Sequence, residues 1–195
     1  MADDNVLRVT GVGEEDRLQR LWSPHRMSYV AAPIPAGGEK GDITTADGSS
    51  AKSEHPFLDI PRMSDEDGLI VARGATVYAV LNLYPYNPGH TMIVPYRQVA
   101  DLEDLTQEES HEVMGFTQHL IRTIKSVSSP HAFNVGLNLG AAAGGSLSEH
   151  LHMHVVPRWG GDANFITVVG ETKVIPQLLQ DTRALLADAW ERESS

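Results

Sequence analysis

Three histidines alternate with apolar residues in the last third of the chain. His150, His152 and His154 are separated by Leu151 and Met153. Such alternation is typical of a half-buried β-strand, so the three imidazoles should leave one face while the apolar side chains pack on the other. Neutral imidazole is both a nucleophile and a proton carrier near pH 7. The stretch is therefore a candidate reaction centre.

Two other interpretations of these histidines stay open at this point. A strand that offers His-x-His can present two zinc ligands, with a third ligand arriving from elsewhere. Alternatively, the imidazoles only satisfy local hydrogen bonds, although three of them on one face are costly to pack without a function. Glu149 is the only carboxylate in the immediate segment. By alternation it should face the same side as Leu151, away from the imidazoles, which weakens the metal interpretation.

Residues on both sides of the histidines could serve a phosphorylated substrate. Gly144, Gly145 and Ser146 precede them, and this segment could cradle an anion with backbone N–H groups and the Ser146 hydroxyl, or could be a flexible turn. Arg158 could pair with distal phosphates or be solvated. Trp159 could stack on a purine or pack at a subunit edge.

Composition limits the class of protein. The chain has 195 residues, 41% of them hydrophobic, a formal net charge of −11 and no cysteine. The charge argues against a nucleic-acid partner, which needs a clustered basic surface. No apolar run is long enough to cross a membrane, and the lack of cysteine fits a cytoplasmic location. Any bound metal would need histidines and carboxylates alone.

The N-terminal part differs from the rest of the chain. Residues 14–29 begin as a short charged helix that Pro24 should end, and residues 31–56 are rich in Pro, Gly, Ser and Thr, as in a mobile linker. The chain is therefore predicted to consist of an N-terminal arm and linker, residues 1–56, and a catalytic domain, residues 57–195.

Five strands and two main helices are predicted in the second part. The expected strands lie at residues 69–72, 76–81, 90–95, 133–139 and 151–156. Thr106 and Glu109 have the capping-box spacing at the start of an amphipathic helix over 106–127, and Leu178, Thr182, Leu185 and Ala189 form one stripe of a final helix. Because strands and helices do not alternate regularly, we expect an α+β fold with an antiparallel sheet.

The motif HLHMHVV of residues 150–156 resembles the signature of the histidine triad family of nucleotide hydrolases and transferases, in which three histidines alternate with apolar residues. Residues 81–90, 134–138 and 156–159 are similar to further blocks of that family, in the family's order. Three segments, residues 20–27, 83–90 and 173–176, most closely resemble the diadenosine tetraphosphate phosphorylases of actinobacteria such as mycobacteria. The resemblance implies a five-stranded antiparallel sheet with two main helices.

The same resemblance implies roles for individual residues. His152 would be the nucleophile, with its Nδ1 proton held by the carbonyl of His150, while His154 would bind phosphate oxygens and His90 would bond within the cluster. Asn82 falls at the ribose position, and Asn138, Gly145 and Ser146 match phosphate-side positions. As isolated residues, Asn82 and Asn138 would be ordinary turn or strand-end residues.

The activity implied is phosphorolysis of diadenosine tetraphosphate to ATP and ADP through an AMP-histidine intermediate. The substrates would be a small nucleotide and inorganic phosphate, without a cofactor, in a homodimer or a dimer of dimers. The leading alternative is a dinucleoside polyphosphate or nucleoside phosphoramidate hydrolase that uses water, and a third is a nucleotide-binding regulatory protein. Many relatives carry a zinc-binding Cys-x-x-Cys where this chain has residues 54–59, EHPFLD, so that structural zinc should be absent.

Overall fold

The part of the chain after residue 69 is built on one five-stranded sheet. In the computed structural model, which describes residues 43–44, 50–51, 55–143, 147–162 and 175–194, the strands run in the order β3-β4-β5-β7-β6 and every neighbouring pair is antiparallel. The strands are β3 (Ile70–Arg73), β4 (Val77–Leu81), β5 (Thr91–Pro95), β6 (Ala132–Gly136) and β7 (Met153–Arg158). The predicted α+β class is confirmed.

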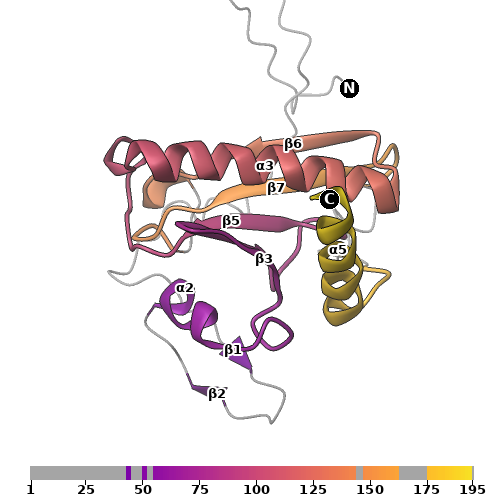
Figure 1. Cartoon of the computed structure of the whole chain (residues 1–195), viewed down its shortest axis with the longest axis horizontal. Helices are drawn as coiled ribbons and strands as arrows, with labels where there is room; N and C mark the ends of the chain where they lie inside the picture. The colour runs from indigo at the N-terminus through magenta and orange to yellow at the C-terminus, as the bar shows by residue number, and fades with distance from the viewer. Residues whose placement is uncertain (1–42, 45–49, 52–54, 144–146, 163–174, 195) are drawn as a thin grey trace, which may run out of the picture. The chain divides into compact units, whose positions relative to one another are not determined.

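Two long helices cover one face of this sheet (Figure 1). Helix α3 (Gln107–Ser128) packs on β4, β5 and β7, and α5 (Leu179–Glu193) packs on α3 and β3. Thr106 and Glu109 form the predicted capping box at the start of α3, which satisfies N–H groups that a helix terminus otherwise leaves unpaired. Neither helix, nor any other in the described part of the chain, is long and apolar enough to span a membrane.

The opposite face of the sheet carries the histidines. The register pairs Val80 with Met92, Met92 with His154, and His154 with Gly136, so these residues share one face of neighbouring strands. The short helix α2 (Pro56–Asp59) lies against this face, because the Tyr78 hydroxyl donates to the carbonyl of Phe57 at 2.8 Å. A one-turn 3₁₀ helix, η2 (Ile60–Arg62), follows α2 directly.

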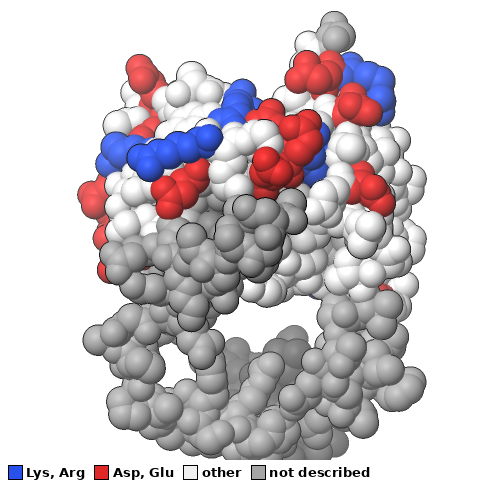
Figure 2. All heavy atoms as spheres, turned by 90° about the horizontal axis from the view of Figure 1, so that it is seen from below, with Lys and Arg blue, Asp and Glu red and all other residues white. Residues whose placement is uncertain are grey.

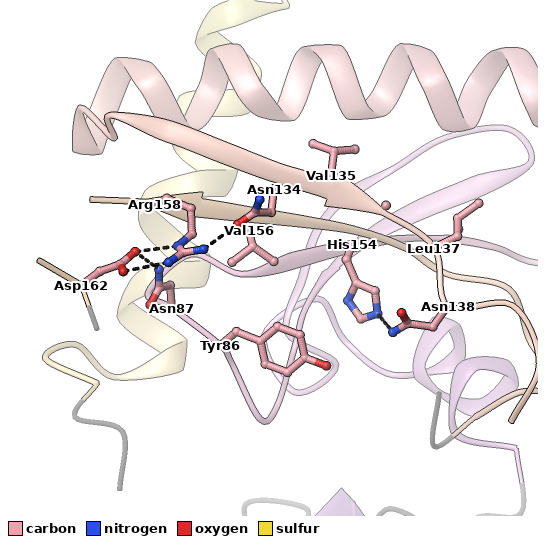
Figure 3. Close-up of a pocket in the computed structure, with 11 residues that line it drawn as sticks. Tyr86, Asn87, Asn134, Val135, Leu137, Asn138, His154, Val156, Arg158 and Asp162 are labelled. Atoms are coloured by element: carbon pink, nitrogen blue, oxygen red, sulfur yellow. Dashed lines mark hydrogen bonds and ion pairs between the residues drawn. The ribbon is translucent and has the colours of Figure 1, made fainter. Parts of the chain in front are cut away.

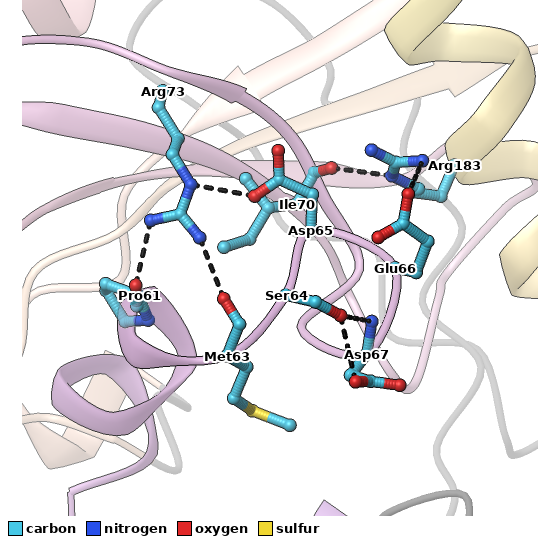
Figure 4. A network of polar contacts seen from close by, with 9 residues as sticks. All are labelled: Pro61, Met63, Ser64, Asp65, Glu66, Asp67, Ile70, Arg73 and Arg183. Atoms are coloured by element: carbon cyan, nitrogen blue, oxygen red, sulfur yellow. Dashed lines mark hydrogen bonds and ion pairs between the residues drawn. The ribbon is translucent and has the colours of Figure 1, made fainter.

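Arg73, at the end of β3, anchors the segment that follows α2 (Figure 4). Its guanidinium donates to the carbonyls of Pro61 and Met63 at 2.9 and 3.1 Å and to the Asp65 carboxylate at 2.7 Å. Arg183 of α5 donates to the carbonyl of Ile70 in β3 at 2.8 Å and to the Glu66 carboxylate of the next turn at 3.4 Å. The connection from α2 to the sheet is therefore held by directional hydrogen bonds to backbone as well as by packing.

The final helix begins close to its predicted place but buries a different stripe. Thr182 and Ala189 are buried as expected, whereas Leu178 is 70% exposed and Leu185 is 38% exposed. Leu186 and Trp190 are buried in addition to the two predicted positions, and the indole of Trp190 packs on Phe116 and His119 of α3. The stripe is rotated because α5 contacts both a helix and a strand.

The N-terminal part lies largely outside the described residues, including the predicted helix in residues 14–29. Within the predicted linker the structure describes a two-stranded antiparallel ladder of β1 (Ile43–Thr44) and β2 (Ser50–Ala51). All the described residues fall within one compact unit, Glu39–Ser195. The division at residues 56 and 57 stays a prediction.

Candidate active site

The four histidines of the candidate site come from two neighbouring strands and the residues just before them. His154 lies in β7, His150 and His152 precede that strand, and His90 precedes β5. All four side chains are buried, with exposed fractions from 0 to 9%. The half-buried strand predicted from the alternation is therefore covered on both faces. Phe57 contributes to this cover, since its ring centroid lies 5.4 Å from that of His150 and 5.1 Å from that of His152.

The hydrogen-bond partner of His152 fixes its tautomer. Its Nδ1 lies 2.8 Å from the carbonyl oxygen of His150. A carbonyl can only accept, so Nδ1 carries the proton and Nε2 keeps its lone pair. Burial lowers the pKa of His152 below the ordinary histidine value, against a smaller opposite effect of this hydrogen bond. The imidazole is thus neutral at pH 7, with an unprotonated Nε2.

A chain of hydrogen bonds fixes His90 and His154 in the same manner. The backbone N–H of Tyr86 donates to His90 Nδ1 at 3.1 Å, so the proton of His90 must sit on Nε2. That nitrogen lies 2.9 Å from His154 Nδ1, which therefore accepts. The proton of His154 is left on its Nε2, which lies 3.4 Å from the Nδ2 atom of Asn138 (Figure 3). Two N–H donors cannot bond each other, so this proton stays available to a ligand. His154 thus offers an N–H donor beside the lone pair of His152, and their ring centroids are 4.8 Å apart.

Burial keeps His90 and His154 uncharged. It lowers the pKa of His90 to about 3 and that of His154 to about 4, with the neighbouring histidines adding to the effect. Burial likewise lowers the pKa of His150, whose Nε2 donates to the carbonyl of Pro95 at 2.9 Å. Four neutral rings with fixed protons present one nucleophilic nitrogen and one donor, which is what attack on a phosphate ester and stabilisation of its oxygens require.

A cavity of about 400 Å³ opens beside His154. We call it the His154 pocket. One side is formed by Tyr86 and Asn87 of the loop between β4 and β5, and the other by residues 134–138. Along its base run His154, Val156 and Arg158 of β7, with Asp162 at the far end (Figure 3). Its volume is within the range of small-ligand sites.

Some of the predicted site residues line this pocket and others lie elsewhere. Asn138 and Arg158 line it. Asn82 is not among the lining residues, but its Nδ2 lies 3.4 Å from His90 Nδ1. Trp159 faces a different cavity, of about 370 Å³, between α3 and α5, and its indole N–H donates to the carbonyl of Ser128 at 3.3 Å. Gly145 and Ser146 lie outside the described residues.

Arg158 has neighbours that the sequence did not indicate. Its Nε and a terminal nitrogen form a two-pronged ion pair with Asp162 at 2.7 and 2.9 Å, and the other terminal nitrogen donates to Asn134 at 2.6 Å. The buried Asn87 amide donates to the same carboxylate at 2.7 Å. These contacts keep the pKa of Asp162 well below its usual range. The positive charge of Arg158 is therefore matched inside the pocket.

The described residues offer neither a cluster of metal ligands nor, on the face shown in Figure 2, a continuous basic patch. Among them, no group of three or more histidine, aspartate or glutamate side chains is placed to hold a metal ion. On the described part of the face in Figure 2, basic and acidic side chains are interspersed and form no continuous basic patch.

The HIT domain family matches residues 64–161, which include the sheet, α3 and all four histidines. The chain belongs to the HIT family. The AP-4-A phosphorylase of Mycobacterium tuberculosis strain H37Rv is 64% identical over 192 residues, which cover 98% of this chain and 94% of that protein. The resemblance stated from the motifs is thus confirmed.

Solved structures show the same HIT architecture. A zinc-bound histidine triad family protein from Mycobacterium smegmatis is 25% identical with a TM-score of 0.53, over 64% of this chain and 84% of that one. A hypothetical histidine triad nucleotide-binding protein from Sulfolobus tokodaii strain 7 is 22% identical with a TM-score of 0.57, over 70% and 91% of the two chains. The second similarity concerns the fold alone.

Proposed function

We propose that this HIT protein is a diadenosine tetraphosphate phosphorylase, which produces ATP and ADP. The observation that carries the proposal is the pair formed by the His152 lone pair and the His154 N–H group, both fixed by hydrogen bonds. The AP-4-A phosphorylase of M. tuberculosis, 64% identical over nearly its full length, supports the same substrate. A neutral imidazole matches the need for a nucleophile that acts near pH 7.

The first half-reaction forms a covalent intermediate. His152 Nε2 attacks the α-phosphorus of one AMP unit, a P–N bond forms, and the bond from that phosphorus to the bridging oxygen of the β-phosphate breaks. ATP leaves with the electron pair of that bond. The proton of His152 stays on Nδ1 and is donated to the carbonyl oxygen of His150, and this hydrogen bond stabilises the positive charge on the ring. His154 donates to an oxygen of the phosphorus under attack.

The second half-reaction regenerates the histidine. An oxygen of inorganic phosphate attacks the same phosphorus, the P–N bond breaks, and ADP forms. We assign the remaining predicted residues to binding: Asn82 to the ribose, and Asn138, Gly145 and Ser146 to the phosphates. Arg158 supports the distal part of the substrate, while Trp159, which faces the other cavity, is placed in the site by the sequence argument alone.

The acceptor test separates phosphorolysis from hydrolysis. Incubation with diadenosine tetraphosphate should give ATP and ADP only when inorganic phosphate is present. ATP and AMP in equal amounts, regardless of phosphate, would instead indicate a hydrolase.

His152→Ala should lower kcat by roughly 10³-fold or more while the circular dichroism spectrum is unchanged. His111→Ala, on the exposed face of α3, is the matched control and should retain activity.

We also propose that the chain forms a homodimer or a dimer of dimers in the cytoplasm. Strand β6 is an edge strand of the sheet, and Val135 within it is 44% exposed. An exposed edge strand is a template for pairing with another chain. The absence of cysteine supports the location.

A further inference from the structure

The His154 pocket extends well beyond the groups that the transfer chemistry needs. In the proposed reaction the phosphates bind at its near end, at His154 and Asn138. From His154 the pocket continues along β7 to Arg158, a distance of roughly 13 Å for four residues of strand. The end of the pocket at Arg158 and Asp162 does not take part in the proposed attack on the α-phosphorus. Another group of the substrate is therefore expected to bind there.

The far end of the pocket is polar but electrically balanced. Arg158 is paired with Asp162 through two hydrogen bonds and with the side-chain oxygen of Asn134 through a third. A phosphate group bound there would lie beside the Asp162 carboxylate as well as beside the guanidinium. Balanced charge with carboxamide groups suits the hydrogen-bonding edges of a base or a ribose better than it suits a free anion.

The middle of the pocket is aromatic and apolar. The Tyr86 side chain is 57% exposed, and Figure 3 shows its ring between His154 and the Arg158–Asp162 pair, below Val156. The ring is nearly parallel to that of His154, at 24° and 5.9 Å between centroids. An exposed aromatic face of this kind is a stacking platform for a nucleobase.

The wall opposite Tyr86 consists of β6 and leaves open space at its centre. Gly136 is opposite His154 in the register, and a Cβ atom built on this glycine would meet nothing within 4 Å. Room for a flat ring therefore exists between the aromatic side and the strand, next to the phosphate-binding end.

We propose that the His154 pocket binds the second nucleoside of the dinucleotide, the one that leaves as part of ATP, with its base on Tyr86. The inference rests on the proposed function, because it assigns the leaving group of that reaction. Tyr86 acts here as a specificity-determining residue. It favours substrates that carry a nucleoside at both ends of the polyphosphate.

Two substrates that differ only in the second nucleoside test this directly: diadenosine tetraphosphate and adenosine 5′-tetraphosphate. The unchanged chain should cleave the first with a kcat/KM at least about tenfold higher than the second, given the usual strength of base stacking. Tyr86→Ala should lower kcat/KM for the dinucleotide by about tenfold more than it lowers that for adenosine tetraphosphate. Comparing each variant with the unchanged chain on the same substrate cancels the charge difference between the two substrates.

Two further variants complete the design. Asn134→Trp places a bulky side chain at an exposed position of β6 and should produce the same selective loss by filling the far end. Tyr84→Ala removes another exposed tyrosine, 66% exposed and two residues away, and should change neither substrate.

Equal losses on both substrates in Tyr86→Ala and Asn134→Trp would overturn the inference, since these residues would then act on the histidines. Equal use of the two substrates by the unchanged chain would overturn it as well, with phosphorolysis still intact. If neither substrate is cleaved, the proposed function itself falls, and this inference falls with it.

Discussion

At the scale of single residues, the site is defined by which nitrogen carries each proton. Backbone groups make that choice: the carbonyl of His150 for His152, and the N–H of Tyr86 for His90. Since backbone groups do not titrate, the tautomers do not change with pH as long as the rings are neutral. The reactive state is therefore present before substrate binds.

Neutral buried histidines should make the fold sensitive to mild acid. Burial lowers the pKa of His90 to about 3 and of His154 to about 4, and lowers those of His150 and His152. Below pH of about 6.5 the unfolded chain takes up protons that the folded chain does not. The free energy of unfolding should fall with decreasing pH, by about 1.4 kcal/mol per pH unit per histidine, until the folded pKa is reached. Urea denaturation at pH 7.5, 6.5 and 5.5 measures this.

A pair of variants isolates the buried histidines. His90→Gln removes one histidine whose pKa is lowered in the folded chain. The free energy of unfolding should then change less steeply with pH, by about 1.4 kcal/mol per pH unit. His111→Gln changes a histidine on the exposed surface of α3 and should leave the slope as it was. A free energy of unfolding that stays constant from pH 7.5 to 5.5 would show that these histidines take up protons in the folded chain as they do in the unfolded one.

Some of this residue-scale detail follows from the sequence and some does not. Alternation placed His152 and His154 on one face, because a strand's side chains alternate regardless of context. Their full burial depends on residues far away in the chain, such as Phe57. The role of Tyr86 depends on the conformation of an irregular loop. Tyr86 stands in a turn-rich segment, where no periodic pattern distinguishes it from Tyr84.

At the scale of elements, α2 has an influence beyond its four residues. Phe57 is 4% exposed and contacts the rings of His150 and His152. Phe57→Ala should lower the free energy of unfolding by about 3 kcal/mol, as for other buried aromatic truncations, and should reduce kcat because water reaches the histidines. Thermal melts and steady-state kinetics measure the two effects.

The control for this variant is Leu102→Ala, at an exposed position of η3 (Leu102–Asp104), which should change stability by less than about 0.5 kcal/mol. Unaltered melting and turnover in Phe57→Ala would mean that α2 does not cover the site in solution.

The sequence predicted which segments form helices and which form strands, but it predicted their first and last residues less accurately. The capping box fixed the start of α3 because both of its partners lie within four residues of each other. The start of β7 at Met153, later than the predicted residue 151, is set by where β5 begins to pair with it, and that pairing joins residues about 60 apart. The buried stripe of α5 was displaced for a similar reason, since the packing of Trp190 on α3 decides it.

At the scale of the whole molecule, the free edge of the sheet should govern assembly. Val135→Lys adds a charge to β6, where an edge strand tolerates it but a second copy of the strand would not. If the chain pairs through this edge, sedimentation equilibrium should give a dimer or larger species for the unchanged chain and a monomer for the variant. Leu102→Ala, distant from β6 in the sequence, should keep the mass of the unchanged chain. The same mass for Val135→Lys would place the subunit contact elsewhere.

Strand β6 has two sides, which the two proposals assign to different ligands. Its Asn134 and Gly136 form a wall of the His154 pocket, while the backbone groups of its other side face away from the sheet. If the nucleoside and the partner strand bind as proposed and one changes the binding free energy of the other, the effect is reciprocal. The apparent affinity for the dinucleotide would then depend on the concentration of the protein itself, and substrate would in turn shift the monomer–dimer equilibrium.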